Sequence, residues 1–315
     1  MLFFSRSLRS FAGPGVSWLL TVLIAILALT SQGISQQCTS YIVVNAFDHK
    51  LHVDIQTLKP EDFEAKMGGT QLEIVSLDQD YNSRLLVLLE MDGVNNTKIH
   101  DTVDTAIRMV REAPEGRPVA FGIYAERVVF TKGFSSDPKE RMKQIGAVVE
   151  EADSLGKRVA MFDALHQALK LFGEHQPGDA VLLIGLPYDD KSDHSVADIE
   201  KEYMRTGTRL MIMQREPLSV VSRDYMWNRH PSERRLFGEV PDETGGANSS
   251  DFDPHFMGFP WRGYLVGVKH PDYAGKPHKW EMKLKHAVKS VLPHSYLYYP
   301  ALLPPCRSTK TAASR

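Results

Sequence analysis

The sequence predicts an α/β fold in which a doubly wound, mainly parallel sheet carries helices on both faces. Three observations support this: continuous apolar runs, amphipathic helical stretches between them, and short polar segments that join the two. A run such as residues 85–89 (LLVLL) is typical of a strand buried on both faces of a parallel sheet. Because strands alternate with helices, right-handed crossovers place the helices on both sides of the sheet.

The elements follow one another along residues 41–213. Strands are expected where β-branched, aromatic or continuous apolar residues cluster, and helices where apolar residues recur on one helical face. The predicted strands are residues 41–47, 51–55, two short strands around Gly68-Gly69, 85–89, 119–124, 128–130, 181–184 and 210–213. The predicted helices include residues 99–110, 142–152 preceded by an Asp137-Pro138 start, 162–172 closed by Gly173, and 196–205.

Composition and pattern divide the chain into five segments. They are a signal peptide or membrane anchor (1–35), an N-terminal β module (38–80), the α/β domain (81–215), a loop-rich segment with a C-terminal β-hairpin (216–304), and a disordered tail (305–315). Alternating apolar residues at 264–268 and 280–284 predict the two strands of that hairpin. The α/β domain therefore carries small β additions at both ends.

The N-terminal segment has the composition of an export signal. Arg6 and Arg9 precede an uncharged apolar run, residues 16–29, and small or polar residues follow. The run is shorter than the roughly 20 residues of a membrane span, which favours a cleaved signal over an uncleaved anchor. We therefore expect an exported protein of the periplasm or cell envelope, attached to a membrane only if residues 16–29 are retained.

Composition and charge narrow the class of protein. Apolar residues make up 43% and charged residues 24%, and the formal net charge is -2, so a soluble globular protein without a nucleic-acid partner is expected. Cys38 and Cys306 are the two cysteines, one near each end. In an oxidising compartment they could pair, or both could stay free thiols, and the sequence leaves these alternatives open.

The sequence offers little sign of enzymatic chemistry. It contains no G-x-S-x-G, H-E-x-x-H or G-x-x-x-x-G-K motif, which predicts a non-enzymatic protein. Asp189, Asp190, Asp193 and His194 gather after a predicted strand and have ligand types that a metal could use. The favoured interpretation is a polar loop that caps the helix beginning near residue 196. Asp163 is expected to cap or brace its own helix.

Three groups of motifs resemble one family. They are LKPEDFEAKMGGTQLEI; then LLVLLEMDGVNNTKI, VAMFDALHQAL and DAVLLIGLPYDD; then DETGG, YLVGVKHP, KWEMKLK and SYLYYP. Their order and spacing over most of residues 41–300 are similar to the von Willebrand factor type A-related proteins of acidobacterial and similar bacterial envelopes. This resemblance implies an α/β domain with a metal-ion-dependent adhesion site at the carboxyl end of its central strand.

The chain departs from the site that the resemblance implies. The family pattern there is Asp-x-Ser-x-Ser with a Thr and a further Asp, since hard cations require several oxygen ligands. The corresponding residues are Glu90, Asp92, Val94, Val159 and Gly185. Three of these five positions offer no side-chain oxygen, so the resemblance implies a degenerate site without a tightly bound metal or other cofactor.

Ligands of open α/β sheets bind outside the carboxyl ends of the strands. We therefore expect a non-enzymatic binding or scaffold protein that recognises a protein or an envelope polymer at this edge. The candidate binding residues are Glu90, Asp92, Asn95, Asn96, Asp189 and Asp190. One alternative is a Mg²⁺- or Ca²⁺-dependent adhesion module whose ion is held by Glu90 and Asp92, with Asp189 or Asp190. Another is a hydrolase of unknown substrate using Asp189, Asp190 and His194.

Overall fold

The computed structural model describes residues 37–91, 96–214, 230–249, 259–271 and 276–305. The predicted signal or anchor (1–35) and all but the first residue of the predicted tail (305–315) lie outside these residues. Residues 1–37 and residues 38–315 form two units. The fold described below is that of the second unit, taken by itself. Within the described ranges, the search for a helix with the length and apolarity of a membrane span finds no candidate.

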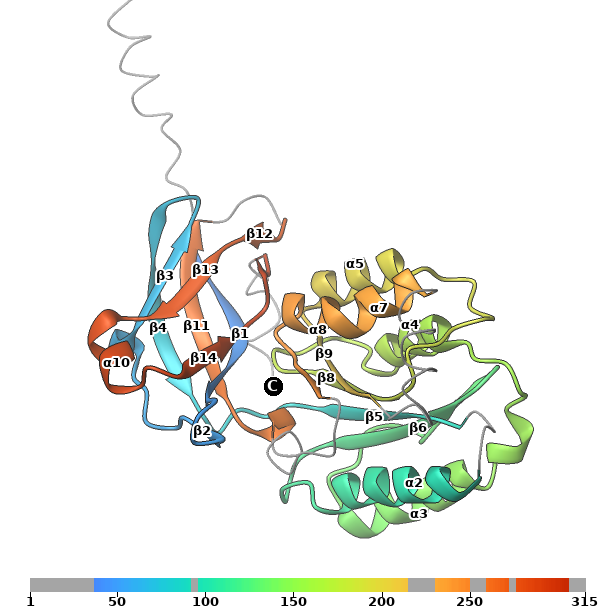
Figure 1. Ribbon diagram of the computed structural model, residues 1–315. Helices are drawn as coiled ribbons and strands as arrows, with labels where there is room; N and C mark the ends of the chain where they lie inside the picture. Colours follow the sequence, from blue (N-terminus) through green and yellow to red (C-terminus); the bar gives the residue numbers. More distant parts are fainter. Residues whose placement is uncertain (1–36, 92–95, 215–229, 250–258, 272–275, 306–315) are drawn as a thin grey trace, which may run out of the picture. The chain divides into compact units, whose positions relative to one another are not determined.

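One sheet of six strands forms the centre of the α/β part, in the order β10-β9-β8-β5-β6-β7 (Figure 1). Neighbouring strands run parallel except β6 and β7, which are antiparallel. This confirms the predicted α/β class with a mainly parallel sheet. The strands are β5 (Leu85–Glu90), β6 (Val119–Tyr124), β7 (Val128–Phe130), β8 (Ala180–Gly185), β9 (Arg209–Gln214) and β10 (Asn248–Ser249).

Helices cover both faces of this sheet. Figure 1 shows α2 and α3 against one face and α4, α5, α7 and α8 on the other. The predicted start of α3 is confirmed, because the Lys139 amide donates to Asp137 Oδ1 at 3.0 Å and Pro138 follows the cap. The helices are α2 (Asn96–Arg111), α3 (Pro138–Val149), α4 (Met161–Leu171), α5 (Val196–Thr206), α7 (Pro231–Gly238) and α8 (Val240–Glu243), with 3₁₀ turns η1 (Pro60–Asp62), η2 (Ala152–Ser154) and η3 (Phe259–Trp261).

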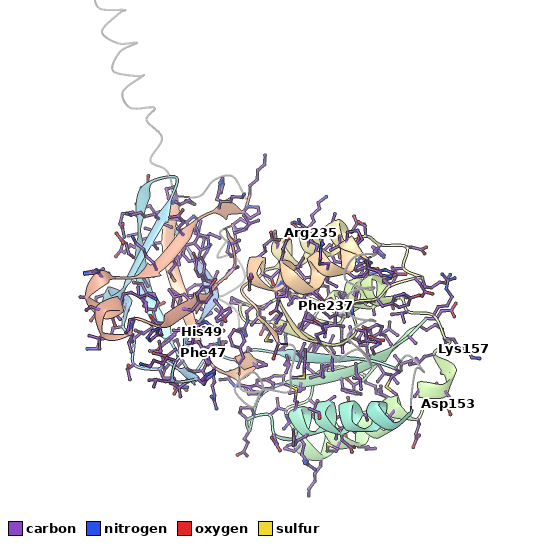
Figure 2. The ribbon with its side chains drawn as sticks, in the orientation of Figure 1. Phe47, His49, Asp153, Lys157, Arg235 and Phe237 are labelled. Carbon is purple, nitrogen blue, oxygen red and sulfur yellow. The ribbon has the colours of Figure 1, made fainter. Side chains whose placement is uncertain are left out.

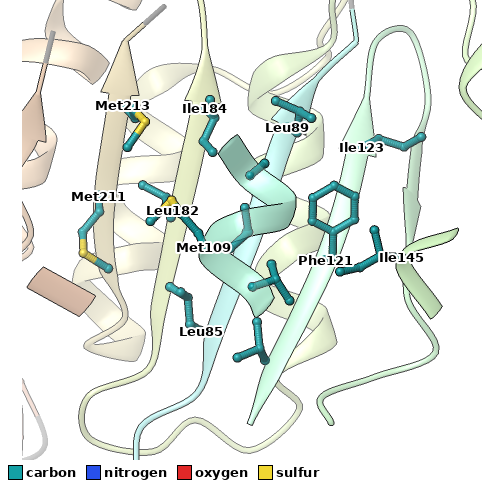
Figure 3. Packing of buried hydrophobic residues seen from close by; sticks show 14 of the residues in the cluster. Leu85, Leu89, Met109, Phe121, Ile123, Ile145, Leu182, Ile184, Met211 and Met213 are labelled. Carbon is teal, nitrogen blue, oxygen red and sulfur yellow. The ribbon is translucent and has the colours of Figure 1, made fainter. Parts of the chain in front are cut away.

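The continuous apolar runs are explained by two cores, one on each face of the sheet. Along β5, Leu85 and Leu89 point into the core beneath α2 and α3, which Figure 3 shows from close by. Leu86 and Leu88 point into the opposite core, against α4 and α5. Because successive side chains of a strand alternate between faces, a strand buried on both sides must be apolar throughout.

The two β additions form a single second sheet, which the sequence did not predict. Its strand order is β13-β3-β4-β11-β1-β14, with β2 beside β1. Strands from residues 37–78 therefore pair with strands from residues 264–298. The strands are β1 (Gln37–Asp48), β2 (Val53–Asp54), β3 (Phe63–Met67), β4 (Thr70–Asp78), β11 (Tyr264–Pro271), β13 (Glu281–Leu284) and β14 (Ser295–Tyr298). A short pair of strands, β12 (His278–Lys279) and β15 (Leu302–Leu303), and a helix, α10 (His286–Val291), complete this part.

The predicted C-terminal hairpin is wrong, although its strands exist. β11 pairs with β4, while β13 pairs with β3, with Leu284 opposite Phe63 and Met282 opposite Ala65. Apolar alternation identifies a strand and its buried face, but it does not identify the neighbour. The turn at Gly68-Gly69 is confirmed, since Met67 pairs with Thr70 across it and both glycines have positive φ.

The segment predicted as loop-rich, residues 216–304, contains further regular structure. α7 and α8 lie within it, and β10 extends the α/β sheet by pairing in parallel with β9. α7 spans eight residues, and its buried positions are Glu233, Leu236 and Phe237, so a charged residue interrupts the apolar pattern of its buried face. β10 has two residues, Asn248 and Ser249, and neither has a strand-forming side chain.

A buried polar cluster joins β1 to β9. The Arg209 side chain is 2% exposed and donates through Nη1 to Asn45 Oδ1 at 2.9 Å and through Nη2 to the Pro260 carbonyl at 3.2 Å. The Asn45 amide donates in turn to the Phe259 carbonyl at 3.1 Å. Burial lowers the pKa of Arg209, yet its hydrogen bonds replace part of the lost hydration.

The start of β1 is fastened to residues from the far end of the chain. Cys38 is disulfide-bonded, so it is no free thiol, and Cys306 is the one other cysteine of the sequence. Ser40 Oγ donates to the Pro304 carbonyl at 2.7 Å and lies 2.8 Å from His270 Nε2. These contacts connect β1 with β11 and with the residues that follow β15.

Arg141 on α3 is expected to destabilise the fold. Its side chain is 2% exposed, burial lowers its pKa, and its three guanidinium nitrogens have no hydrogen-bond partner among the described residues. Replacing Arg141 with Met, which is similar in length, should raise the free energy of unfolding by about 1–4 kcal/mol. Urea unfolding of Arg141→Met measures this, with Lys143→Met on the exposed side of α3 as the control. A loss of stability in Arg141→Met would contradict the prediction.

Candidate functional site

The carboxyl edge of the parallel sheet is where the sequence places a binding site. β5 ends there at Glu90 and its neighbour β8 ends at Gly185, with Leu89 opposite Ile184 in the register. Glu90 is 1% exposed, and its Oε2 accepts a hydrogen bond from the Leu186 amide at 2.6 Å. Glu90 is therefore internal to the edge and holds the start of the loop after β8.

Gly185 is what makes room for the Glu90 carboxylate. A Cβ atom at position 185 would lie 2.5 Å from Glu90 Oε2 and 2.9 Å from the Tyr124 hydroxyl. Gly185 occupies the position where the family resemblance implies an Asp. The Glu90 carboxylate fills the space beside this position, so it leaves no room for a side chain at position 185.

Asp189 and Asp190 are engaged in holding their loop against α4. Asp189 Oδ2 accepts from the Phe162 amide at 2.9 Å and from Ser192 Oγ at 2.6 Å, and its Oδ1 accepts from the Ser192 amide at 3.0 Å. Asp190 Oδ1 accepts from the Val159 amide at 2.8 Å. Together these bonds satisfy amides at and just before the start of α4.

This corrects the predicted role of the loop. The loop of Asp189 and Asp190 caps α4 rather than the helix that follows it. α5 has its own cap, because Ser195 Oγ accepts from the Asp198 amide at 3.3 Å and the Asp198 carboxylate accepts from the Ser195 amide at 2.9 Å, the reciprocal arrangement of a capping box.

Asp163 braces the same loop from α4, whereas the sequence predicts that it caps or braces its own helix. Its Oδ1 accepts from the His194 amide at 3.0 Å and contacts His194 Nδ1 at 2.7 Å. Partial burial acts to raise the pKa of Asp163, but the hydrogen bonds from His194 and Asp193 outweigh burial and lower it. The His194 ring stacks on His166, with centroids 3.9 Å apart, and His166 Nδ1 lies 2.6 Å from Glu202 Oε2.

The predicted hydrolytic group is not assembled in this arrangement. The partner of the His194 imidazole is Asp163, while the carboxylates of Asp189 and Asp190 accept from backbone amides and from Ser192 and Arg158. An activated nucleophile requires a base within hydrogen-bond reach. These contacts instead connect the loop to α4.

Some of the predicted site residues have side chains outside the described part of the chain. Asp92 and Asn95, together with Val94, lie outside the described residues. Asn96 is the first residue of α2, and its side chain is not described. Of the six candidate binding residues, the structure thus brings Glu90, Asp189 and Asp190 to the carboxyl edge.

The described residues do not fit the divalent ion that the family resemblance implies. Val159 and Gly185 supply no side-chain oxygen, and the oxygens of Asp189 and Asp190 accept hydrogen bonds from amides. Mg²⁺ and Ca²⁺ need six or more oxygen ligands in a compact shell. In the ranges that the structure covers, no three His, Cys, Asp or Glu side chains gather so as to hold a metal ion.

The contact between Gly185 and Glu90 is testable by mutation. Gly185→Ala is expected to lower the free energy of unfolding by about 1–3 kcal/mol, because the new methyl group overpacks the Glu90 carboxylate. Glu90→Ala removes the contact at 2.5 Å and leaves the Tyr124 hydroxyl at 2.9 Å and the Cβ atom of residue 90 at 3.1 Å, so adding Gly185→Ala should cause a smaller further loss. A double-mutant cycle in urea measures this coupling, and strict additivity of the two changes would contradict the described contact.

Two features of this edge were missed by sequence reasoning. Tyr124, at the end of β6, lies beside Gly185, and Ser192 links Asp189 to α4 through its bond to the Asp163 amide at 3.0 Å. A glycine at a strand end is a signal for close approach of another group. The Ser192 contact spans distant parts of the chain and leaves no local pattern.

No family model and no curated protein matches the chain. Solved structures that match include the von Willebrand factor type A protein of Catenulispora acidiphila, with 11% identity over 89% of this chain and 76% of that one, at a TM-score of 0.45. An aerotolerance-related membrane protein of Bacteroides fragilis matches with 14% identity over 56% and 94%, at 0.39. The conserved hypothetical protein BatB of Bacteroides thetaiotaomicron matches with 13% identity over 42% and 67%, at 0.36. Of these three, the protein of Catenulispora acidiphila is the one described as von Willebrand factor type A.

Proposed function

We propose that this chain is an exported, non-enzymatic binding or scaffold protein that recognises a protein at the carboxyl edge of its parallel sheet. Recognition there is direct and requires no tightly bound Mg²⁺ or Ca²⁺. The observation that carries the proposal is the set of hydrogen bonds that the carboxylates at this edge accept. Glu90, Asp189 and Asp190 accept hydrogen bonds from backbone amides of the protein. These bonds hold the carboxyl edge in place.

A carboxyl edge that is ordered by these hydrogen bonds favours direct binding of a partner over adhesion through a metal ion. The loop after β8 is fixed to α4 by Asp189 and Asp190 on one side and by Asp163 on the other. A preformed surface loses less conformational entropy when a partner binds. Export is supported by the order of basic, apolar and small residues in 1–35.

Metal independence is tested by titration calorimetry of the full chain with MgCl₂ and CaCl₂. We expect no saturable heat up to millimolar concentration in the parent protein or in Glu90→Gln. Saturable binding that is lost in Glu90→Gln would overturn this part of the proposal and favour the remodelled adhesion site.

The location of the binding surface is tested by site-specific cross-linking. Lys157 is exposed and lies at the carboxyl edge, near Asp153 (Figure 2). A photoreactive residue at position 157 should cross-link one protein band from native envelopes, both with EDTA and with magnesium. The matched control is position 174, an exposed glutamate before β8, at the opposite edge of the sheet. Equal cross-linking from both positions, or cross-linking abolished by EDTA, would contradict the proposal.

A further inference from the structure

A cleft of about 690 Å³ lies beside β14, apart from the residues of the carboxyl edge. Its volume falls within the range of about 300–1,000 Å³ found for small-ligand sites. α8 is fastened beside β14 by a bond from the Ala301 amide to the Glu243 carbonyl at 2.8 Å. Four aromatic side chains line the cleft: Trp280, Tyr296, Tyr298 and Tyr299.

Two of the four aromatic residues serve the fold. Trp280 is 5% exposed and donates through Nε1 to the Pro300 carbonyl at 2.7 Å. The Tyr299 hydroxyl accepts from the Met282 amide at 3.1 Å. These contacts hold Trp280 and Tyr299 in place. Of the other two rings, Tyr298 is half-buried against Phe259, with centroids 5.2 Å apart. Tyr296 is the more exposed, with its centroid 5.8 Å from that of His49.

Tyr296 and Tyr298 point to the same side of β14, because they alternate with the buried residues Ser295 and Leu297. Their ring centroids are 4.8 Å apart with an interplanar angle of 66°. Tyr296 is 50% exposed, unusual for so large an apolar surface. Within the described part of the chain, neither hydroxyl forms a hydrogen bond.

The cleft also holds a carboxylate without a counter-charge. Partial burial raises the pKa of Asp242, and no basic side chain among the described residues offsets this. Burial first, then the charges of Asp242 and Tyr296, raises the pKa of Tyr298 to about 12. Two lysines and one further acid also line the cleft, Lys66, Lys279 and Glu281. Lys66 is 3.3 Å from Glu64, and neither lysine lowers the pKa of Asp242. The part of the cleft at Asp242 therefore holds a carboxylate that no described lysine compensates.

We propose that this cleft binds an ammonium group, the side chain of a lysine on a partner protein, between Tyr296, Tyr298 and Asp242. Aromatic faces attract a cation through their quadrupole, and the carboxylate adds a charge-assisted hydrogen bond. A neutral sugar would contact the rings but leave the Asp242 charge uncompensated. This site goes beyond the proposed function, since it uses residues of β14 and α8 rather than the carboxyl edge.

The proposal is tested by calorimetric titration of the full chain with Nα-acetyl-lysine amide, whose side chain is a free ammonium. The same compound acetylated at Nε is the matched neutral probe. We expect saturable millimolar binding of the first, at least about tenfold weaker binding of the second, and about tenfold loss in Asp242→Asn. Tyr296→Ala should weaken binding by about fivefold.

Two controls separate lost binding from lost folding. Burial already disfavours the charge of Asp242, so Asp242→Asn should keep the unfolding midpoint of the parent protein or raise it. Tyr41→Ala removes a ring of similar exposure, 47%, on β1 and should leave binding unchanged. Equal affinity for both probes, unchanged binding in Asp242→Asn, preferential binding of a neutral disaccharide, or no saturable binding would each overturn the proposal. None of these outcomes bears on metal independence at the carboxyl edge.

Discussion

Asp179→Ala is expected to lower the free energy of unfolding by about 3–5 kcal/mol, because it removes one partner of a buried ion pair. The Asp179 side chain is fully buried and accepts from Arg84 Nε at 2.9 Å and from Arg84 Nη2 at 2.6 Å. It also accepts from the Gln176 amide at 2.8 Å. The change would leave the Arg84 guanidinium, which lies over the rings of Phe134 and Phe172, without its counter-charge.

Urea unfolding followed by circular dichroism measures this loss. The matched control is Glu200→Ala, which removes the carboxylate that Arg235 reaches with two nitrogens at 3.0 and 2.9 Å. Both nitrogens of Arg235 donate to the same oxygen of Glu200, and the Arg235 side chain is 40% exposed. Arg235 also keeps Glu239 and Glu243 as partners, at 3.0 and 3.8 Å. Solvent screening and these remaining partners should make the loss much smaller. Comparable losses from both substitutions would show that burial does not decide the strength of these pairs.

Gly246→Ala is expected to cost about 3 kcal/mol or more, because it places a methyl group against the backbone of β9. A Cβ atom at position 246 would lie 1.8 Å from the Leu210 carbonyl oxygen and 2.6 Å from its carbon. No flexible side chain can yield there. The Ala247 carbonyl, which accepts from the Ile212 amide at 3.0 Å, would have to move, and β10 would separate from β9.

Thermal and urea unfolding of Gly246→Ala test this, together with loss of hydrogen-exchange protection at Ile212. Gly238, the last residue of α7, is the matched control because a Cβ atom there meets nothing within 4 Å. Gly238→Ala should be neutral or stabilise by up to about 1 kcal/mol. A Gly246→Ala protein as stable as the parent would mean that β10 does not approach β9 so closely.

The strands of the α/β sheet could be predicted because their signal is local. Residues 85–89, 119–124 and 181–184 are continuously apolar, and each belongs to a strand buried on both faces. The start of α3 could also be predicted, because its cap, Asp137, and its first residue, Pro138, are neighbours in the sequence. In each case the burial or cap that stabilises the element is encoded within a few positions.

What could not be predicted depends on partners far apart in the chain. The pairing of β1 with β14 joins Asn45 to Tyr298, and β11 pairs with β4 rather than with β13. The role of Asp189 follows from the Phe162 amide, 27 residues away. The burial of Glu90 follows from the absence of a side chain at Gly185. None of these contacts leaves a pattern that a window of neighbouring residues can reveal.

In the second sheet, strands from the two ends of the chain are neighbours, and this also constrains how the protein folds during its synthesis. Apart from its short pairing with β2, the first strand finds its neighbours in residues 264–271 and 295–298. While the ribosome makes the intervening two hundred or so residues, β1 has an unsatisfied backbone and an apolar face. Such distant pairing slows folding and exposes strands that can aggregate. The second sheet can therefore close only after the C-terminal strands have been made. A truncation that removes the strands of either terminus would leave those of the other terminus without their hydrogen-bonded neighbours.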